Sequence, residues 1–227
     1  MKYAISDLHG CYEKYMKMLE KINFSDDDEL YVLGDVCDRG DGGIKILLDM
    51  MKRPNVTPLK GNHDYLAQKL LPELENEYDS EEQNKTLEIF RLWLLDGANP
   101  TIKAFLELDE QTKAKVLAYI RTFQYYEKVS AGGREFFLSH TLPDYEDGNT
   151  IYDYPILMFS VGEADYEKDY IPGTYTVTGH TPTMLIDPDF KGRILKKGSH
   201  IAIDCGAVFG NPLGCICLDT MEEFYVD

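Results

Sequence analysis

The sequence lacks a long apolar run and has few basic residues. None of its 227 residues belongs to an apolar stretch of the roughly 18 residues that a membrane helix needs, and its start lacks the pattern of a secretory signal. We therefore expect a cytoplasmic protein without a membrane partner. The 23 basic residues face 40 acidic ones, and the formal charge of −17 repels polyanions. This balance disfavours a nucleic-acid polymer as partner, and some of the acids could instead be cation ligands.

Cysteine is sparse, and its spacing excludes two common uses. The five cysteines are scattered, and none forms a C-x-x-C pair of the kind that binds zinc or exchanges disulfides. An odd number of widely spaced cysteines favours free thiols in a reducing compartment. Cys215 and Cys217 alternate within a strand-like segment, so we expect them to fill the core.

No segment rich in proline, glycine and serine divides the chain, and we see no internal repeat. We therefore predict one domain over residues 1–227. Strand-like runs alternate with helical spacing early in the chain and give way to hairpin-like strands later, which predicts an α/β sandwich of mixed central sheets flanked by helices. The expected strands are 2–6, 29–34, 56–61, 125–131, 134–140, 174–180, 200–206, 214–220 and 222–227.

A helix-rich insertion is expected at about 65–123. Leu87, Phe90 and Leu94 recur at intervals of three and four residues, as apolar residues do on one face of a helix. Trp93 lies in the same stretch and is expected to be core. The acidic segment PELENEYDSEEQ, residues 72–83, fits a solvated helix face and loop, with a substrate-selecting lid as the alternative.

Polar residues of metal-ligand type follow the first three predicted strands. Asp7 and His9 end the first, Asp35 follows the second, and Asn62 and His63 follow the third. Asp35 comes 28 residues after Asp7 and 27 before Asn62, which is about the length of one strand-helix unit. Because ligands bind at this edge of an α/β sheet, we expect these side chains to converge. Taken singly, Asp7 could merely cap a helix and His9 could be a turn residue.

Two further histidines, His140 and His180, end later strand-like runs. Either could be a buried structural histidine, but the whole set offers the oxygen and nitrogen donors that suit manganese, iron or zinc better than calcium. Asp35 has two carboxylate oxygens and could lie between two ions, as in two-metal hydrolysis of phosphoesters. The sequence therefore predicts two divalent metal ions, with manganese as the first expectation and iron or zinc as alternatives.

The ordered motifs resemble those of a known family, the phosphoprotein phosphatases among the calcineurin-like metallophosphoesterases. The motifs that carry this resemblance are DLHG at 7–10, GDVCDRG at 34–40, GNHD at 61–64, the strand ending at 140, and GHT at 179–181. IAIDCGAVFG at 201–210 resembles the family's usual closing strand. LWLLDGANPT at 92–101 resembles a helical segment of its compact bacterial and phage serine/threonine phosphatases, to which the resemblance is closest. The resemblance implies the family's α-β-β-α sandwich.

The resemblance also implies a ligand set for each metal ion, with Asp35 as the bridge. One ion would be bound by Asp7, His9 and Asp35, and the other by Asp35, Asn62, His140 and His180. It implies direct attack by a metal-bridging hydroxide, without a covalent phosphoenzyme.

The remaining motif residues would serve catalysis and phosphate binding. The resemblance implies that His63 is the general acid, that Asp38 orients its ring, and that Arg39 binds phosphate through its planar fork of donors. Pairing with one of many acids is the ordinary alternative for Arg39. The phosphate contacts implied for this chain are Arg39, Asn62, His63 and Lys60.

Three departures from the family pattern concern phosphate binding and one ligand. Lys60 stands where many relatives have arginine, and an ammonium cannot make the same bidentate contact. No arginine occurs between His140 and His180, where relatives usually supply another. Thr141 follows His140 where a smaller residue is usual.

These features predict a phosphomonoesterase acting on phosphoserine or phosphothreonine in proteins or on small phosphoesters, with phosphotyrosine as a further candidate substrate. A dinucleoside polyphosphate hydrolase, with a substrate such as diadenosine tetraphosphate, is the alternative, because GNHD also occurs in that branch. Asp38, which that branch often lacks, argues against it. A metal-bearing phosphate-binding protein without activity is a third hypothesis. The sequence does not indicate an oligomeric state.

Overall fold

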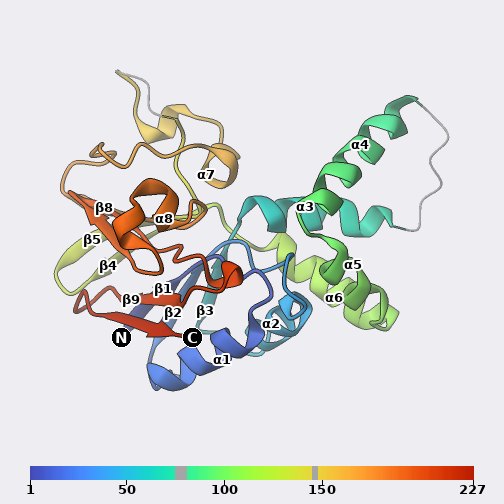
Figure 1. The fold of residues 1–227 in the computed structure, drawn as a ribbon, viewed down its shortest axis with the longest axis horizontal. Coiled ribbons are helices and arrows are strands. Elements are labelled where there is room, and N and C mark those ends of the chain that lie inside the picture. The colour runs from blue at the N-terminus through green and yellow to red at the C-terminus, as the bar shows by residue number, and fades with distance from the viewer. Residues whose placement is uncertain (75–80, 145–147) are drawn as a thin grey trace.

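Two β-sheets form the centre of the computed structural model, which describes residues 1–74, 81–144 and 148–227 (Figure 1). The first sheet has the strand order β10-β9-β1-β2-β3, with β1, β2 and β3 parallel and β9 and β10 antiparallel to their neighbours. Its strands are β1 (Lys2–Ile5), β2 (Glu29–Leu33), β3 (Val56–Leu59), β9 (Leu213–Cys217) and β10 (Glu223–Val226).

The second sheet has the order β4-β5-β6-β8-β7. A hairpin joins β4 and β5, while β5, β6 and β8 run parallel and β7 is antiparallel at the edge. Its strands are β4 (Tyr126–Ala131), β5 (Arg134–Ser139), β6 (Thr174–Thr178), β7 (Leu195–Lys197) and β8 (His200–Ala202). The expected mixed sheets are therefore confirmed, and β7 is a strand that the sequence pattern did not reveal.

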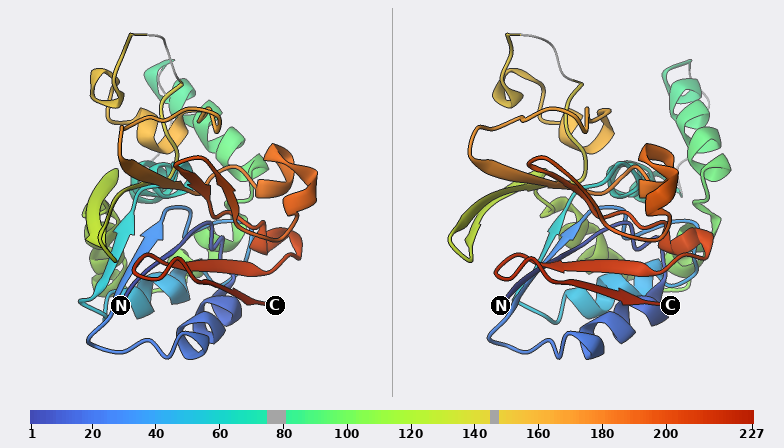
Figure 2. Two further views of the ribbon diagram at one scale, coloured as in Figure 1. Left: turned by 90° about the vertical axis from the view of Figure 1, so that its left-hand side faces the viewer. Right: turned by 60° about the vertical axis from the view of Figure 1, so that its left-hand side comes forward.

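Apolar side chains from both sheets fill the space between them. Ala4 and Leu33 of the first sheet share one buried cluster with Phe136, Val177 and Ile201 of the second. Alternate residues of a strand point to opposite faces, so the other faces of both sheets need separate cover. Figure 2 shows the two sheets as stacked layers with helices outside them.

Helices cover the outer faces of the two sheets unequally. On the first sheet lie α1 (Tyr12–Lys21) and α2 (Gly43–Met50), whose apolar residues recur at helical spacing and are buried. On the side of the second sheet the helices α7 (Met158–Val161) and α8 (Thr183–Ile186) are only four residues long. The predicted α-β-β-α sandwich is confirmed. Short 3₁₀ turns occur at Leu71–Glu73, Ile151–Asp153, Pro188–Phe190 and Ala207–Phe209.

The expected helical insertion is also confirmed, and it starts slightly earlier than predicted, at Asn62. Trp93, Phe105 and Ile120 of the insertion belong to the same buried cluster as Ile5 of the first sheet. This shared core supports one domain over 1–227, which stays a prediction. Half of the acidic segment 72–83, residues 75–80, lies outside the described residues. The helices are α3 (Asn62–Leu70), α4 (Glu81–Leu95), α5 (Asn99–Leu106) and α6 (Glu110–Arg121).

The turns that follow β1, β2, β5 and β6 meet at one edge of the sandwich. The backbone N–H of Asp7 donates to Gly34 at 3.2 Å, and that of His9 donates to Asp35 at 2.8 Å. The N–H of Gly179 donates to His140 at 2.9 Å, which ties together the turns of the second sheet. The parallel strands thus bring the motif residues to one place, as the topology rule predicts.

Two other sequence expectations concern cysteine and membranes. All five cysteines are free, and Cys215 and Cys217 are buried in the core as expected. Among residues 1–74, 81–144 and 148–227, no helix combines the length and apolar character needed to cross a bilayer.

Candidate metal centre

Asp35 is the residue around which the site is built. It follows β2, it is buried, and its carboxylate accepts a hydrogen bond from the backbone N–H of His63 at 3.0 Å. Burial alone would raise the pKa of Asp35, but the nearby His140 and His63 outweigh it and hold that pKa well below the usual value. Asp35 is therefore a carboxylate anion in a largely buried setting, where only cationic partners can compensate its charge.

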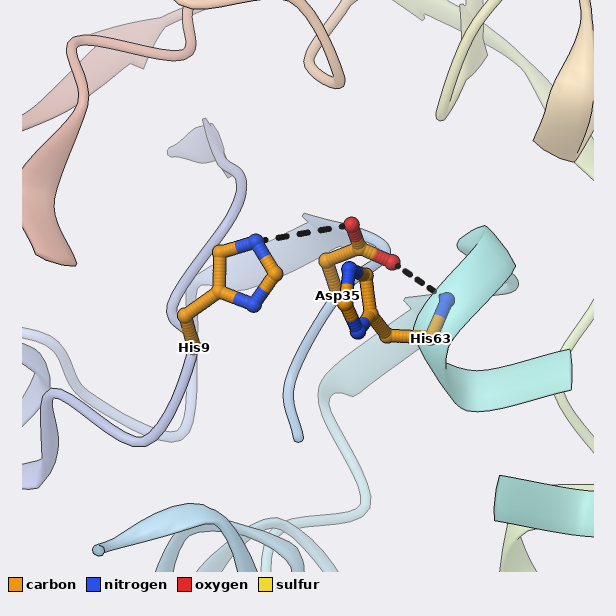
Figure 3. A group of neighbouring side chains, drawn as sticks. All are labelled: His9, Asp35 and His63. Atoms are coloured by element: carbon orange, nitrogen blue, oxygen red, sulfur yellow. Dashed lines mark hydrogen bonds and ion pairs between the residues drawn. The ribbon is translucent and has the colours of Figure 1, made fainter. Parts of the chain in front are cut away.

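A first group of neighbouring side chains consists of His9, Asp35 and His63, whose possible ligand atoms all lie within 4.8 Å of one another. His9 and Asp35 belong to the predicted ligand set, whereas His63 is the predicted acid. Figure 3 shows the His9 ring nitrogen directed at one Asp35 oxygen, at 3.6 Å, while the other oxygen accepts from the backbone N–H of His63. Nδ1 of His9 lies 3.0 Å from the carbonyl oxygen of Cys37. A carbonyl at that nitrogen fixes the tautomer and leaves the lone pair on Nε2, the nitrogen that could bind a cation.

A second group consists of Asp35, His140 and His180, and it shares Asp35 with the first. Nε2 of His140 lies 3.4 Å from Asp35 Oδ2 and 3.0 Å from Nδ1 of His180. The side-chain oxygen of Asn62 is 3.1 Å from the same nitrogen. Nδ1 of His140 lies 2.8 Å from the Leu33 carbonyl oxygen, which orients the ring toward this group.

Asp7 lies between the two sheets but belongs to neither of these groups. Its Oδ2 accepts from the backbone N–H of His180 at 3.0 Å, and its buried Oδ1 has no hydrogen-bond partner in the described part of the chain. Burial raises the pKa of Asp7 to about 6. A buried carboxylate oxygen without a partner is costly, and a bound cation would supply the missing interaction. This orphaned oxygen fits a metal ligand.

The three histidines predicted to bind metal, His9, His140 and His180, differ in charge. Burial lowers the pKa values of His9 and His180 to about 4, so both rings are neutral near pH 7 and each has one unprotonated nitrogen. Burial also disfavours the charged form of His140, but the Asp35 carboxylate outweighs it and raises the pKa of His140 to about 10. In the metal-free protein the proton on His140 therefore compensates Asp35, and a divalent cation would replace it.

Backbone conformation singles out the same residues. Of the described residues other than glycine, eight have a positive φ, and six of these are candidate site residues. The left-handed region costs a non-glycine residue roughly 1–3 kcal/mol and persists where surrounding structure enforces it, often at functional sites. The six residues, with their φ angles, are Asp7 (50°), His9 (39°), Asp35 (54°), Asp38 (71°), Arg39 (66°) and His180 (68°).

His63 forms a buried pair with Asp38. Nδ1 of His63 lies 2.7 Å from Asp38 Oδ2, and the same oxygen accepts from Nε1 of Trp93 at 2.6 Å. Burial would lower the pKa of His63, but the Asp35 and Asp38 carboxylates outweigh it and raise that pKa. Trp93 is buried, as expected for core, and it also holds the carboxylate that orients His63. No pattern in the sequence indicated that second role.

Arg39 lies close to the rings of His9 and His63. Its guanidinium nitrogens are 2.7 Å from Nε2 of His9 and 3.1 Å from Nε2 of His63. Nη2 of Arg39 donates to Asp96 at 2.9 Å, and the Phe209 ring centre is 5.5 Å from the guanidinium carbon. The planar fork therefore lies where an oxyanion near His63 could accept from it.

Lys60 is the predicted site residue that the structure keeps apart from the others. It is buried, its ammonium donates to the side chain of Gln68, and it lies 5.7 Å from the centre of the Tyr125 ring. Within the described residues, no contact joins it to Arg39 or His63. Its role as a phosphate ligand stays a prediction.

Asp64, the last residue of the GNHD motif, is a supporting residue to which the sequence assigned no role. Its carboxylate accepts from the backbone N–H groups of Asp35 at 2.8 Å, Gly61 at 3.1 Å and Val36 at 3.1 Å. It thereby caps α3 and holds the strained turn at Asp35. An acidic residue three positions after a helix N-cap is a recognisable signal for the first of these functions.

The comparisons with known proteins agree with this geometry. A family model described as calcineurin-like phosphoesterase matches residues 3–184. The chain belongs to the calcineurin-like phosphoesterase family. The family resemblance predicted from the sequence motifs is thus confirmed.

Individual members of the calcineurin-like phosphoesterases differ in how much of the chain they match. The chain is 24% identical to serine/threonine-protein phosphatase 2 of Salmonella typhimurium, over 99% of its own length and 92% of that protein. It is 41% identical to the symmetrical bis(5'-nucleosyl)-tetraphosphatase of Buchnera aphidicola subsp. Acyrthosiphon pisum, but over only 64 residues. That match spans 27% of this chain and 23% of the relative.

A solved structure provisionally described as a diadenosine tetraphosphatase superposes with a TM-score of 0.63 at 17% identity. The superposition covers 99% of this chain and 92% of that one. At this identity the likeness shows the calcineurin-like phosphoesterase fold alone.

Proposed function

We propose that the chain is a metal-dependent phosphomonoesterase that removes phosphate from serine or threonine side chains of proteins. The observation that carries the proposal is the buried His63–Asp38 pair, at 2.7 Å, beside Arg39 and beside two ligand groups that share Asp35. Phosphotyrosine and small phosphoesters are further substrates of the same chemistry.

The side chains divide the reaction between them. Two divalent cations, with manganese the first to test, would supply Lewis acidity and an activated water. Arg39 binds the phosphoryl oxygens through its planar fork and stabilises their negative charge. As the water oxygen bonds to phosphorus and the ester P–O bond breaks, His63 donates its proton to the leaving oxygen, giving an alcohol and inorganic phosphate. Asp38 keeps the His63 ring oriented and protonated until that step.

Relatives support the protein-phosphatase assignment over the whole length of the chain. The match to the Salmonella serine/threonine-protein phosphatase 2 includes nearly all of both proteins. An alkoxide from serine or threonine leaves poorly until it is protonated, and His63, whose pKa the Asp35 and Asp38 carboxylates raise, answers this need.

Hydrolysis of dinucleoside tetraphosphates is a second candidate. Its support is the 41% identity to the Buchnera tetraphosphatase, which exceeds the 24% identity to the Salmonella phosphatase but is confined to 64 residues. The lack of further arginines argues against this candidate. Arg39 contacts the candidate acid, His63, but the sequence between His140 and His180 contains no arginine that could bind the other phosphate groups of a tetraphosphate. A phosphate-binding protein without activity is the third candidate, and it has no need of the His63–Asp38 pair.

Three measurements separate these candidates. Turnover of an aryl phosphate with manganese and with EDTA, and of a phosphoserine peptide after His63→Asn, tests for an enzyme; metal-loaded protein that binds phosphate but never turns over would leave only the binding protein. Rates on a phosphoserine peptide and on diadenosine tetraphosphate, measured side by side, then choose between the two hydrolases. We expect the peptide to be the better substrate by kcat/KM.

A further inference from the structure

Asp96 lies between the two side chains that the proposed reaction uses at the leaving group. One of its oxygens is 2.9 Å from Nη2 of Arg39, and the other is 3.3 Å from Nε2 of His63. Its side chain is 46% exposed, whereas those of His63 and Asp38 are almost fully buried. Asp96 is thus an accessible carboxylate on the rim of the site, and the proposed chemistry gives it no task.

The backbone fixes this placement. Asp96 directly follows α4, and its N–H still donates to the carbonyl of Leu92 at 3.0 Å. Gly97 then turns with φ +104°, and its carbonyl accepts from the N–H of Arg39 at 2.8 Å. A Cβ on Gly97 would lie 2.9 Å from Cγ of Arg39, so only glycine permits this approach.

The role of His63 indicates which part of the substrate lies next to Asp96. Since His63 gives its proton to the ester oxygen, whatever is attached to that oxygen lies next to His63 Nε2. Asp96 is 3.3 Å from that nitrogen, so its negative charge faces the leaving group. A second anion brought there would meet repulsion, whereas an ammonium, a guanidinium or an N–H donor would be attracted.

We propose that Asp96 is a specificity-determining residue that favours leaving groups flanked by cationic side chains and disfavours anionic ones. Its preferred substrates are then phosphoserine or phosphothreonine next to lysine or arginine. Nucleotide leaving groups and acidic peptides are disfavoured. This inference rests on the proposed phosphomonoesterase function and narrows its substrate class.

A purely structural role for Asp96, holding Arg39 in place, gives a different pattern. Loss of that support would lower kcat/KM on every phosphoester by the same factor, because Arg39 contacts the phosphoryl group common to all of them. A charge facing the leaving group instead changes the ratio between substrates that differ only in charge. The ratio is therefore the decisive readout.

The test uses two phosphoserine peptides that are identical except for lysine or glutamate beside the phosphoserine. With manganese-loaded wild type we expect the lysine peptide to have a kcat/KM up to about fivefold higher, which is the scale of one partly exposed charge pair. In Asp96→Asn the ratio should fall toward one, and diadenosine tetraphosphate turnover should rise relative to aryl phosphate. Asp96→Ser, tested in parallel, should give the same ratio as Asp96→Asn. That agreement would show that the change is not a defect specific to asparagine.

Glu88→Gln is the matched control. It removes one exposed negative charge from the same helix, eight residues before Asp96 and so roughly 12 Å along the helix axis. We expect it to keep the wild-type ratio. Raising the ionic strength should reduce the preference of wild type, because exposed charge pairs are screened.

Two kinds of failure are distinguishable. If manganese-loaded wild type hydrolyses no aryl phosphate or peptide, the proposed function is wrong. If it does hydrolyse them but both peptides react equally well, or the preference survives unchanged in Asp96→Asn and Asp96→Ser, the role of Asp96 is overturned and the proposed function stands.

Discussion

The two halves of the site are held in place by different parts of the chain. On the metal side, Asp7, Asp35 and His180 sit in turns directly after strands, with left-handed backbone and contacts among neighbouring turns. On the leaving-group side, Asp38 and Arg39 depend on the helical insertion.

Three contacts from the insertion, all from one short segment, hold the leaving-group side. The Trp93 ring N–H donates to Asp38, the Gly97 carbonyl accepts from Arg39, and the Thr101 hydroxyl accepts from the N–H of Asp38 at 2.8 Å. The comparison teaches that the sheet edge gathers the metal donors, whereas the insertion sets the acid and the phosphate contact. Changes on the two sides should therefore fail in different ways.

The largest effect is expected from Asp35→Asn, on the metal side. Both ligand groups lose their shared carboxylate, so we expect kcat/KM to fall about 10⁴-fold or more, with loss of stoichiometric manganese binding. Isothermal titration with manganese and steady-state kinetics measure the two losses together.

Asp41→Asn is the control for Asp35→Asn, because Asp41 is exposed and only six residues further along. It should stay within about twofold of wild type. Full activity in Asp35→Asn would show that the metal side does not depend on the bridge.

His63→Asn probes the leaving-group side and should spare the metal side. We expect a loss of 10² to 10⁴ in kcat on phosphoserine peptides, since a positioned acid contributes about that much. Aryl phosphates with acidic phenols need no proton donor and should lose far less. Manganese binding should be retained; an equal loss on both substrates would refute the role of His63 as acid.

Metal affinity should depend on pH in the direction set by His140. Its pKa, raised to about 10 from 6.5, means that a cation must displace a proton below about pH 10. We expect the apparent manganese affinity to rise about tenfold per pH unit, hence about 100-fold between pH 6.5 and 8.5. Titrations in buffers of different ionisation enthalpy would detect the released proton, and a pH-independent affinity would contradict this account.

The same pair affects the stability of the metal-free protein. Because the folded pKa of His140 lies above the unfolded one, the Asp35–His140 pair contributes stability in full below about pH 6.5. That contribution is lost as the pH rises toward 10.

The smallest of these effects is expected from Trp93→Phe. It deletes the N–H that binds Asp38 and keeps most of the ring, so we expect kcat to fall about tenfold, or about 1.4 kcal/mol, with KM nearly unchanged. Phe105→Leu, a buried apolar change in the same insertion, should lower the melting temperature without this loss of kcat. A loss in Phe105→Leu equal to that in Trp93→Phe would mean that the insertion acts through stability alone.

The difference between the two sides also explains what the sequence could predict. The strands and the residues at their ends were recognisable, because strand periodicity is local and parallel strands deliver their carboxyl ends to one edge. The contact of Trp93 with Asp38 joins residues 55 positions apart. It depends on how the insertion packs, and no local pattern encodes that.

Two residues, Lys60 and Asp96, show what a motif does not reveal about its side chains. Lys60 directly precedes a motif, and its role in phosphate binding stays a prediction, but nothing in the sequence indicated that Gln68 engages its ammonium. Asp96 belongs to a segment noted only for its resemblance, yet it contacts both Arg39 and His63. Position in a motif therefore predicts where a backbone lies better than where a long or exposed side chain points.

The central claim is that two ligand groups share Asp35 and bind two cations. A crystal of the protein grown with manganese, with diffraction measured at the manganese absorption edge, tests it most directly. We expect two anomalous peaks about 3.5–4 Å apart with the Asp35 carboxylate between them. A single peak, or two peaks of which only one touches Asp35, would contradict it.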